Sequence, residues 1–537
     1  MELPARRGST IFYRGKTLLS RIDPAGQAER FINDLDVKDR TLYLCPSPLY
    51  GYGLSLLLDK LKNGSAILCV ENDIRLFELS LKTMKPLLEN ENRIKLMRPK
   101  TSVNAEAEIC SYVRNQWGER KFRRLETLRL TGGWQLSPEF YERTAAALQK
   151  DIALSWGNAM TLIKLGRLYI RNAVKNLALL PEAGSISEPD FGEDPILVLG
   201  AGPGMDIALD SFITGEERNF RIICADTCLP SLKERGVRPD LVVILESQHW
   251  NLRDFLNVRG WKIPAAMDLS ALPASGRILG GDIFFFMTPW TDLRLFTRLE
   301  KAGLLPPRLS PLGSVGLAAA ELATRIGKGP IITAGLDFSF TLDAYHARST
   351  PGHLARLAAV NRLKSPLGAE TAFREGTYKT QSKSGNPVRS DPALRNYRNL
   401  FENEFSGIGR MYEIEGSGLP LGLKQLSIPQ AKKILTENKS RNSGITETKN
   451  RIADVTQINE FIKIEKTNLE KLKNILTGNL PAQPAELEEL IDASDYLWAH
   501  FPECAAAGSS RPPITDLGFL KRIRMEIDPF LNLWKPQ

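Results

Sequence analysis

The alternation of short apolar runs with helical segments between residues 194 and 422 constrains the fold of this chain more than any other feature. Five runs are almost wholly apolar, and segments with helical spacing separate them, including a strongly apolar one at Val315–Ile326. The runs are Ile196–Leu199, Arg221–Ala225, Leu241–Leu245, Ile283–Met287 and Ile331–Ala334. Such strands are typical of parallel sheets that helices cover on both faces. The sequence therefore predicts an α/β fold with a central Rossmann-like domain at 194–422.

The region before this domain, residues 1–187, shows a weaker α/β pattern. A strand at Thr41–Cys45 leads into a Pro/Gly turn and a helix, and a second apolar run ends on Glu71. The turn Ser47–Gly53 together with Glu71 partly matches a ribose-binding Rossmann half. Its glycines are sparse and a proline interrupts them, which favours a structural domain without a ligand over a second nucleotide site.

Helical patterns dominate the rest of the chain. A connecting helix is expected at Leu165–Leu180, followed by a linker at Pro181–Pro195 that is rich in Glu, Gly, Ser and Pro. Residues 423–537 predict a helical C-terminal domain with a long amphipathic helix at Ile452–Leu476. No catalytic pattern is visible there, so we expect a scaffold or a partner-docking element.

Composition restricts the class of protein. The 71 basic and 62 acidic residues give a net charge of +9, which suits an anionic ligand. The basic residues are scattered, so we expect no nucleic-acid partner. No stretch reaches the roughly 20 apolar residues of a membrane span, and the first residues lack the apolar run of a signal peptide. The six dispersed cysteines show no zinc-site spacing. We therefore expect a cytoplasmic protein without a membrane span or a metal site.

A glycine-rich turn follows the first strand of the central domain. It contains Gly200, Gly202, Pro203 and Gly204 and leads directly into a helix. Glycines let a backbone turn sharply and approach a phosphate, and a helix N-terminus offers unpaired N–H groups to that anion. The turn is neither a full Rossmann fingerprint nor a Walker A motif. By itself it indicates only a phosphate contact.

Polar residues end the next two strands. Asp226 and Thr227 follow the second strand, and Glu246 and Ser247 follow the third. Since the carboxyl ends of parallel strands lie at one edge of a sheet, these residues are expected beside the glycine turn. Acids and hydroxyls at that edge are typical of a nucleotide pocket, where they contact the ribose and the base.

Later segments of the domain reach the same edge. Gly313 and Ser314 open the apolar helix, where Ser314 could cap the helix or donate to an anion. Asp337 follows the last of the five strands, and His346 and His353 lie just beyond it. A histidine near the substrate can act as a general base at neutral pH.

These segments resemble the motility-associated factor (Maf) flagellin glycosyltransferases, whose central domain belongs to the MptE-like family. The resemblance lies in Ile196–Asp206, in Ala225–Asp240 with its Gly-Val-Arg-Pro-Asp turn, in Gly313–Ala320, and in Ile331–Phe338 with His346-Ala347. It covers residues 194–353, and the flanks agree only in their organisation.

The resemblance implies a sialyltransferase-type fold and a specific reaction. The protein would transfer a nonulosonic acid, such as pseudaminic or legionaminic acid, from its CMP-activated form to Ser or Thr hydroxyls of flagellin in the cytoplasm. Gly200–Gly204 would hold the phosphate, and Asp226, Thr227, Glu246 and Ser247 would contact the nucleoside or sugar. Gly313, Ser314 and Asp337 would complete the nucleotide-sugar site. His346 would take the acceptor proton, the attacked carbon would invert, and no separate cofactor or metal would be required.

Two departures from the family pattern leave alternatives open. Gly204 stands where the family usually has Ser, and Glu246 where related sequences often carry Asp. Either change could alter the choice of donor or reduce activity. One alternative is a 6-hydroxymethylpterin pyrophosphokinase, which would require acids placed for magnesium and ATP. Another is a non-catalytic factor that binds flagellin during assembly.

Overall fold

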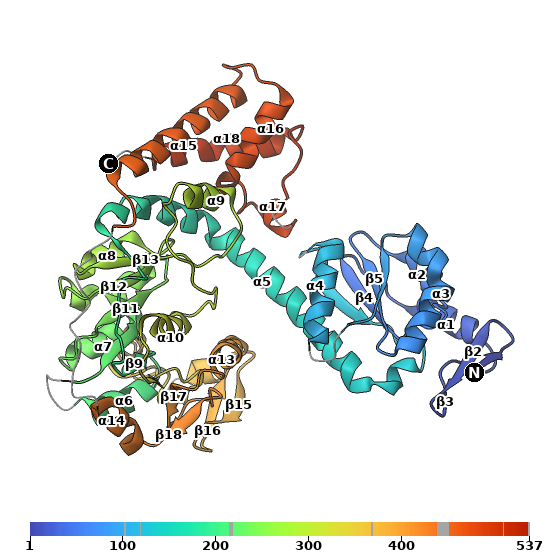
Figure 1. Cartoon of the computed structure of the whole chain (residues 1–537), viewed down its shortest axis with the longest axis horizontal. Helices are drawn as coiled ribbons and strands as arrows, with labels where there is room; N and C mark the ends of the chain where they lie inside the picture. The colour runs from blue at the N-terminus through green and yellow to red at the C-terminus, as the bar shows by residue number, and fades with distance from the viewer. Residues whose placement is uncertain are drawn as a thin grey trace. The chain divides into compact units, whose positions relative to one another are not determined.

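The computed structural model describes residues 1–100, 104–118, 120–213, 218–366, 369–437, 451–507 and 510–534. The chain forms two compact units, residues 1–165 with 498–513 and residues 166–497 with 514–537 (Figure 1). The long helix α5 (Pro138–Leu177) contributes residues to both units. The sequence pattern predicts a different division, into domains at residues 1–187, 194–422 and 423–537. This division stays a prediction.

The first unit contains a parallel four-stranded sheet in the order β6-β5-β4-β7. Its strands are β4 (Thr41–Pro46), β5 (Ala66–Val70), β6 (Ile94–Met97) and β7 (Arg124–Thr127). The helices are α1 (Pro24–Asp34), α2 (Leu54–Lys60), α3 (Ile74–Asn90), α4 (Ala105–Trp117) and α17 (Pro502–Ala506). A small antiparallel sheet of β1 (Glu2–Pro4), β2 (Ser9–Tyr13) and β3 (Lys16–Thr17) precedes them.

Glu71, the acid that partly matched a ribose-binding pattern, is buried in this unit with 1% of its surface exposed. One carboxylate oxygen accepts a hydrogen bond from Ser47 Oγ at 2.6 Å, and the other accepts from Tyr141 Oη at 3.2 Å. Burial raises the pKa of Glu71 and these hydrogen bonds oppose the rise. The carboxylate is satisfied inside the protein, which supports the interpretation of a structural domain.

A parallel nine-stranded sheet forms the centre of the second unit, in the order β18-β17-β14-β9-β10-β11-β12-β13-β8 (Figure 1). The strands are β8 (Gly184–Ser185), β9 (Ile196–Leu199), β10 (Arg221–Ala225), β11 (Leu241–Ile244), β12 (Ala265–Asp268), β13 (Ile283–Phe286), β14 (Ile331–Ala334), β17 (Met411–Ile414) and β18 (Lys424–Leu426). All five predicted strands are present within one residue of their expected ends. The predicted Rossmann-like α/β fold is confirmed.

The central strands form because nearly every side chain on them is buried, as β9, β10 and β11 show throughout their lengths. Helix α10 (Val315–Ile326) contacts β9, β10, β11 and β14 and buries small side chains such as Ala319 and Ala323 against them. The other helices between the strands are α6 (Gly204–Phe212), α7 (Leu229–Glu234), α8 (Pro273–Leu279) and α9 (Arg294–Lys301). The loops that connect these helices to the strands therefore lie at the amino and carboxyl ends of the strands.

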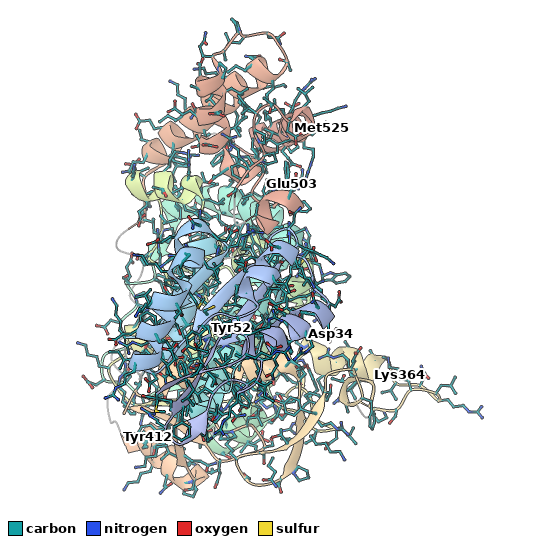
Figure 2. All side chains as sticks on the ribbon, turned by 90° about the vertical axis from the view of Figure 1, so that its right-hand side faces the viewer. Asp34, Tyr52, Lys364, Tyr412, Glu503 and Met525 are labelled. Atoms are coloured by element: carbon teal, nitrogen blue, oxygen red, sulfur yellow. The ribbon has the colours of Figure 1, made fainter. Side chains whose placement is uncertain are left out.

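An insertion separates β14 from β17. It contains α11 (Pro351–Ala358), α12 (Ala369–Ala372), the antiparallel pair β15 (Tyr378–Gln381) and β16 (Pro387–Ser390), and α13 (Pro392–Phe405). The loop after α11 is exposed and carries Lys364 away from the body of the unit (Figure 2). Strand β18, in the region expected to be helical, extends the sheet, and α14 (Ile428–Glu437) packs on α6.

The last part of the second unit is helical, as predicted. It contains α15 (Val455–Leu476), α16 (Pro484–Ala493) and α18 (Leu517–Leu531). Asp454 begins α15 with a capping box, in which it accepts from Gln457 N at 2.8 Å. Among the residues that the structure describes, no helix is both long and apolar enough to cross a membrane.

Candidate nucleotide-sugar site

The strand order of the large sheet reverses between β9 and β14. Strands β10 to β13 follow β9 on one side, whereas β14, β17 and β18 lie on the other. In open parallel sheets, ligands bind outside the carboxyl ends of the strands at such a reversal. The glycine turn after β9 and the Gly335–Asp337 segment after β14 both lie there. The structure thus brings together at one edge the residues that the sequence predicted.

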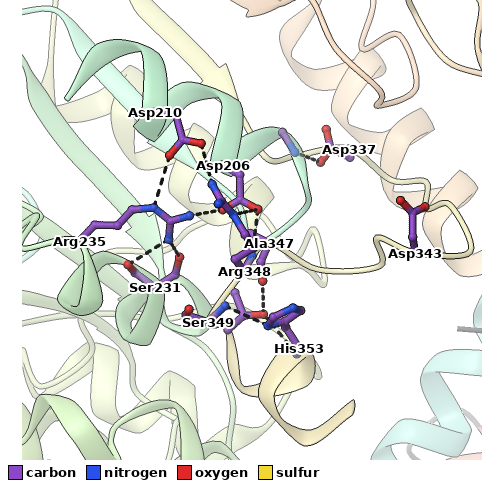
Figure 3. A network of polar contacts seen from close by, with 12 residues as sticks. Asp206, Asp210, Ser231, Arg235, Asp337, Asp343, Ala347, Arg348, Ser349 and His353 are labelled. Carbon is purple, nitrogen blue, oxygen red and sulfur yellow. Dashed lines mark hydrogen bonds and ion pairs between the residues drawn. The ribbon is translucent and has the colours of Figure 1, made fainter. Parts of the chain in front are cut away.

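The glycine turn packs directly against the segment that follows β14. Gly202 N donates to Gly335 O at 2.9 Å, and Gly204 N donates to Asp337 Oδ2 at 2.6 Å (Figure 3). A Cβ on Gly200 would stand 2.5 Å from Gly335 O, and one on Gly202 would stand 2.4 Å from Asp337 Oδ2. The glycines are therefore required for the close approach of two backbone segments. The Gly204 amide, predicted to hold phosphate, is bonded to a carboxylate of the protein.

Asp337 is only 5% exposed and lies at the N-terminus of α6. Burial raises its pKa, while the hydrogen bond from Gly204 N and the charge of Lys383 oppose the rise. A carboxylate at this position is stabilised by the positive end of the helix dipole. Asp337 thus acts on the turn as a cap, and a direct contact with substrate stays a prediction.

Asp226 is the most deeply buried acid of the predicted site, with 1% exposure. It accepts hydrogen bonds from Asn251 Nδ2 and from Thr227 N, both at 2.9 Å. Burial raises its pKa to about 7, and the charges of Asp254 and Glu246 add to that effect. Asp226 therefore titrates near neutral pH. Of the two predicted residues Asp226 and Thr227, only Thr227 is partly exposed and could contact a ligand.

The loop after β11 carries Glu246 and Ser247. Glu246 is half-buried and accepts from Gln248 N at 2.8 Å, whereas Ser247 is 1% exposed and its hydroxyl has no hydrogen-bond partner among the described residues. Helix α5 fixes this loop, because Asn172 Nδ2 donates to Ser247 O at 3.0 Å and to Ser270 O at 3.1 Å.

One turn later on α5, Asn176 Nδ2 donates to Leu269 O at 2.8 Å and to Ala271 O at 2.9 Å. Asn172 and Asn176 thus hold the loops after β11 and β12 in place. Sequence reasoning missed this function. The available signal was two asparagines four residues apart in a helix, where this residue type is unfavourable unless its side chain is bonded.

Aromatic side chains border the same edge of the sheet. The rings of Tyr169 on α5 and Trp290 lie 5.1 Å apart in an edge-to-face arrangement. Tyr397 on α13 would contact a Cβ on Gly313 at 3.5 Å. Burial raises the pKa of Tyr169 to about 12, and the charges of Glu246 and Asp268 contribute. None of these aromatic residues stood out in the sequence, because they lie on segments far apart in the chain.

Ser314 and Gly313 begin α10 at this edge. Ser314 occupies the N-cap position, but its hydroxyl accepts no hydrogen bond from the helix. Gly313 has a φ of +69°, in the left-handed region that favours glycine. Both residues are at least partly exposed, so they remain available to a ligand.

His346 lies in the loop that covers the glycine turn. The Ala347 amide donates to Ala201 O at 2.9 Å, and the His346 ring is hydrogen-bonded to the same backbone. Burial lowers the pKa of His346, so the imidazole is neutral at neutral pH. Because one ring nitrogen donates to the Ala201 carbonyl, the other nitrogen is an acceptor, as a general base requires.

His353 is less suited to that function. Its Nδ1 accepts from Ser349 N at 3.2 Å, so the acceptor nitrogen of the neutral ring is already engaged (Figure 3). Arg348, in the same loop, pairs with Asp210 at 2.6 Å and donates its amide to Asp206 at 2.9 Å. These contacts tie the loop to α6. In the described ranges, no group of three or more His, Cys, Asp or Glu side chains could hold a metal ion.

The part of the chain that forms this edge is similar to a known protein family. Residues 168–343 match the family model described as 6-hydroxymethylpterin diphosphokinase MptE-like. This segment, which is similar to MptE-like domains, includes strands β9 to β14 and every predicted nucleotide-sugar residue, and it ends just before His346.

The similarity to known proteins extends beyond residues 168–343. The chain is 28% identical over 554 residues to a protein of Treponema pallidum (strain Nichols) described as uncharacterized, covering 99% of this chain and 94% of that protein. The solved structure of the Maf glycosyltransferase from Magnetospirillum magneticum AMB-1 aligns with a TM-score of 0.54 at 15% identity. This alignment covers 98% of this chain and 89% of that chain. The predicted resemblance to Maf glycosyltransferases is confirmed at the level of the fold.

Proposed function

We propose that the protein is a glycosyltransferase that transfers a nonulosonic acid from a CMP-activated donor to Ser or Thr hydroxyls of flagellin. The observation that carries this proposal is the similarity to the Maf glycosyltransferase, which covers 98% of this chain and is not confined to residues 168–343. A reaction in the cytoplasm, as the resemblance implies, is part of the proposal.

The donor would lie along the carboxyl edge of β9, β10 and β11. Gly202, Pro203, Thr227, Glu246 and the Gly313–Ser314 pair are at least partly exposed there and would contact it. Gly200 and Gly204 would shape the turn from its buried side. The remaining members of the predicted site, Asp226, Ser247 and Asp337, are nearly buried. Asp226 and Asp337 would act mainly through their neighbours, whereas the Ser247 hydroxyl has no hydrogen-bond partner among the described residues.

His346 would act as the general base. Its second ring nitrogen would accept the proton of the acceptor hydroxyl as that oxygen attacks the anomeric carbon of the donor. The bond from this carbon to the CMP phosphate would break, CMP would leave with the electron pair, and direct displacement would invert the carbon. The lowered pKa of His346 keeps the base in its reactive neutral form at neutral pH. In this mechanism the CMP-sugar is a substrate and no separate cofactor takes part.

A second candidate function is diphosphate transfer to 6-hydroxymethylpterin, which the description of the family model favours. Two assays of the purified full-length chain separate the candidates. One contains CMP-legionaminic acid or CMP-pseudaminic acid with flagellin, and the other contains ATP, magnesium and 6-hydroxymethylpterin. We expect CMP release and glycosylated flagellin in the first assay and no product in the second. Product in the second assay alone would refute the glycosyltransferase proposal.

A non-catalytic flagellin-binding factor is the third possibility. It predicts that flagellin binds while neither assay gives product, and that CMP does not raise the temperature of thermal unfolding. A glycosyltransferase predicts a rise, because a ligand that binds only the folded state stabilises it.

A further inference from the structure

Several polar atoms at the carboxyl edge of β11 and β12 have no hydrogen-bond partner among the described residues. They include the buried hydroxyl of Ser247 and the buried indole N–H of Trp290. The half-buried tyrosines Tyr169 and Tyr397 lie nearby, since the charge of Tyr397 acts on the Tyr169 hydroxyl. Buried polar groups in folded proteins are normally bonded, so the unbonded Ser247 hydroxyl and Trp290 indole N–H point to a missing partner.

These residues come from distant parts of the second unit and meet at one place. Tyr169 contacts the ring of Trp290, and the charges of Glu246 and Asp268 and the hydroxyl of Tyr397 all act on the Tyr169 hydroxyl. Asn172, three residues after Tyr169 on α5, holds the backbone of Ser247. Tyr397 in turn approaches Gly313. The cluster therefore lies within the proposed donor site, on its β11–β12 side.

The chemistry of the cluster selects the kind of ligand. Two phenols, an indole N–H and a serine hydroxyl can donate hydrogen bonds, and Glu246 can accept them. The aromatic faces offer an apolar surface to C–H groups. Both Glu246 and Asp268 would repel a phosphate. A ring with several hydroxyl groups satisfies the donors, the acceptor and the apolar surface together.

We propose that Tyr169, Trp290, Tyr397, Glu246 and Ser247 form a subsite that binds a polyhydroxylated ring of the donor substrate. This inference rests on the proposed glycosyltransferase function and adds a ring-binding part to its site. The ring is either the ribose of the CMP moiety or the transferred sugar, because both present hydroxyl groups on a compact ring. The phosphate lies outside this subsite, nearer to the glycine turn and α10.

Isothermal titration calorimetry with the full-length protein tests the subsite. The probes are CMP and free legionaminic acid, which separate the two sources of the ring. Tyr397→Phe removes one hydroxyl and Trp290→Phe removes the indole N–H, while each retains an aromatic ring. Tyr378→Phe is the matched control, because Tyr378 is a half-buried tyrosine on β15 of the same insertion. Thermal unfolding of each variant verifies its fold, and Tyr169→Phe replaces any variant that is unstable.

We expect Tyr397→Phe and Trp290→Phe to weaken the binding of one probe about three- to tenfold, the loss that one hydrogen bond produces. The affected probe identifies the ring, and the control binds like the native protein. The subsite is refuted if both variants bind both probes with native affinity, or if the native protein binds neither probe. A different result would refute the proposed function and leave the subsite intact. In that case the native protein binds a probe and the variants weaken its binding, but no sugar is transferred to flagellin.

Discussion

The packing of the glycine turn against Asp337 predicts a large effect of one added methyl group. A Cβ on Gly204 would stand 2.7 Å from Asp337 Oδ1 and 3.2 Å from both Asp337 Oδ2 and Gly335 N. The carboxylate cannot move away freely, because it accepts the 2.6 Å hydrogen bond from the Gly204 amide. Gly204→Ala must therefore shift the turn or break this hydrogen bond.

The magnitude follows from these two costs. Overpacking a well-packed site destabilises a protein by about 1–3 kcal/mol. Loss of a hydrogen bond to a charged group costs about 1.5–3 kcal/mol. A shift of the turn relieves part of the overpacking, and breaking the hydrogen bond lets the carboxylate move away, so the two costs do not add in full. We expect a decrease of about 2–4 kcal/mol in the free energy of unfolding. Asp337→Ala alone should cost about 1.5–3 kcal/mol, and the double variant should cost at least about 1 kcal/mol less than the sum, because no carboxylate remains to clash with the new methyl group.

Differential scanning calorimetry of the full-length protein measures these effects on the transition of the second unit. In a unit of this size, 1 kcal/mol corresponds to roughly 1–2 °C, so we expect Gly204→Ala to lower the midpoint by about 2–8 °C. Gly407→Ala is the control, since a Cβ at Gly407 meets no atom within 4 Å. A midpoint for Gly204→Ala within 1 °C of the native value, with additive effects in the double variant, would show that the described packing is wrong.

Other predictions concern the base, the loops and the core. If His346 is the base, transfer should rise with pH and reach half of its maximum below pH 6.5, because burial lowers the pKa of this imidazole from its usual value of about 6.5; a rate profile with an apparent pKa above 7 contradicts it. Asn172→Ala should lower the free energy of unfolding by about 1–3 kcal/mol in calorimetry, because two buried carbonyls lose their donor. An unchanged midpoint would show that Asn172 does not hold these loops. Asp194→Ala should cost about 1.5–3 kcal/mol, because Arg221, 1% exposed, loses its 2.8 Å partner but retains Asp240 at 3.3 Å; a shift below 1 °C counts against this.

Much of the fold could be predicted from the sequence, because the central strands are buried on both faces. The run Ile196–Leu199 is apolar at every position, and β9 has these bounds. Strand β12 escaped detection, because Ala265 and Ala266 are small and the strand ends on the buried acid Asp268. Strand β18 escaped because Lys424 and Gln425 are exposed at the end of the sheet. Strong apolarity marks the centre of a sheet, and it fades toward the edges.

The site could be predicted only in part. The sequence placed the polar strand ends at one edge, since parallel strands share that edge. It could not show that Asp337 reaches Gly204 across 133 positions in the chain, and so the turn suggested a phosphate loop. Nor could it gather Tyr169, Trp290 and Tyr397, because each lies on a different segment without a local motif. Contacts between distant segments decide which polar atoms remain available to a ligand.

The most direct test of the central claim is the intact mass of flagellin from cells that do and do not contain this protein. The account predicts that flagellin from cells with the native protein is heavier by whole multiples of one nonulosonic acid residue. It further predicts that this increase is absent without the protein and when His346→Ala replaces it. Identical flagellin masses in the presence and absence of the native protein would contradict the proposed glycosyltransferase function.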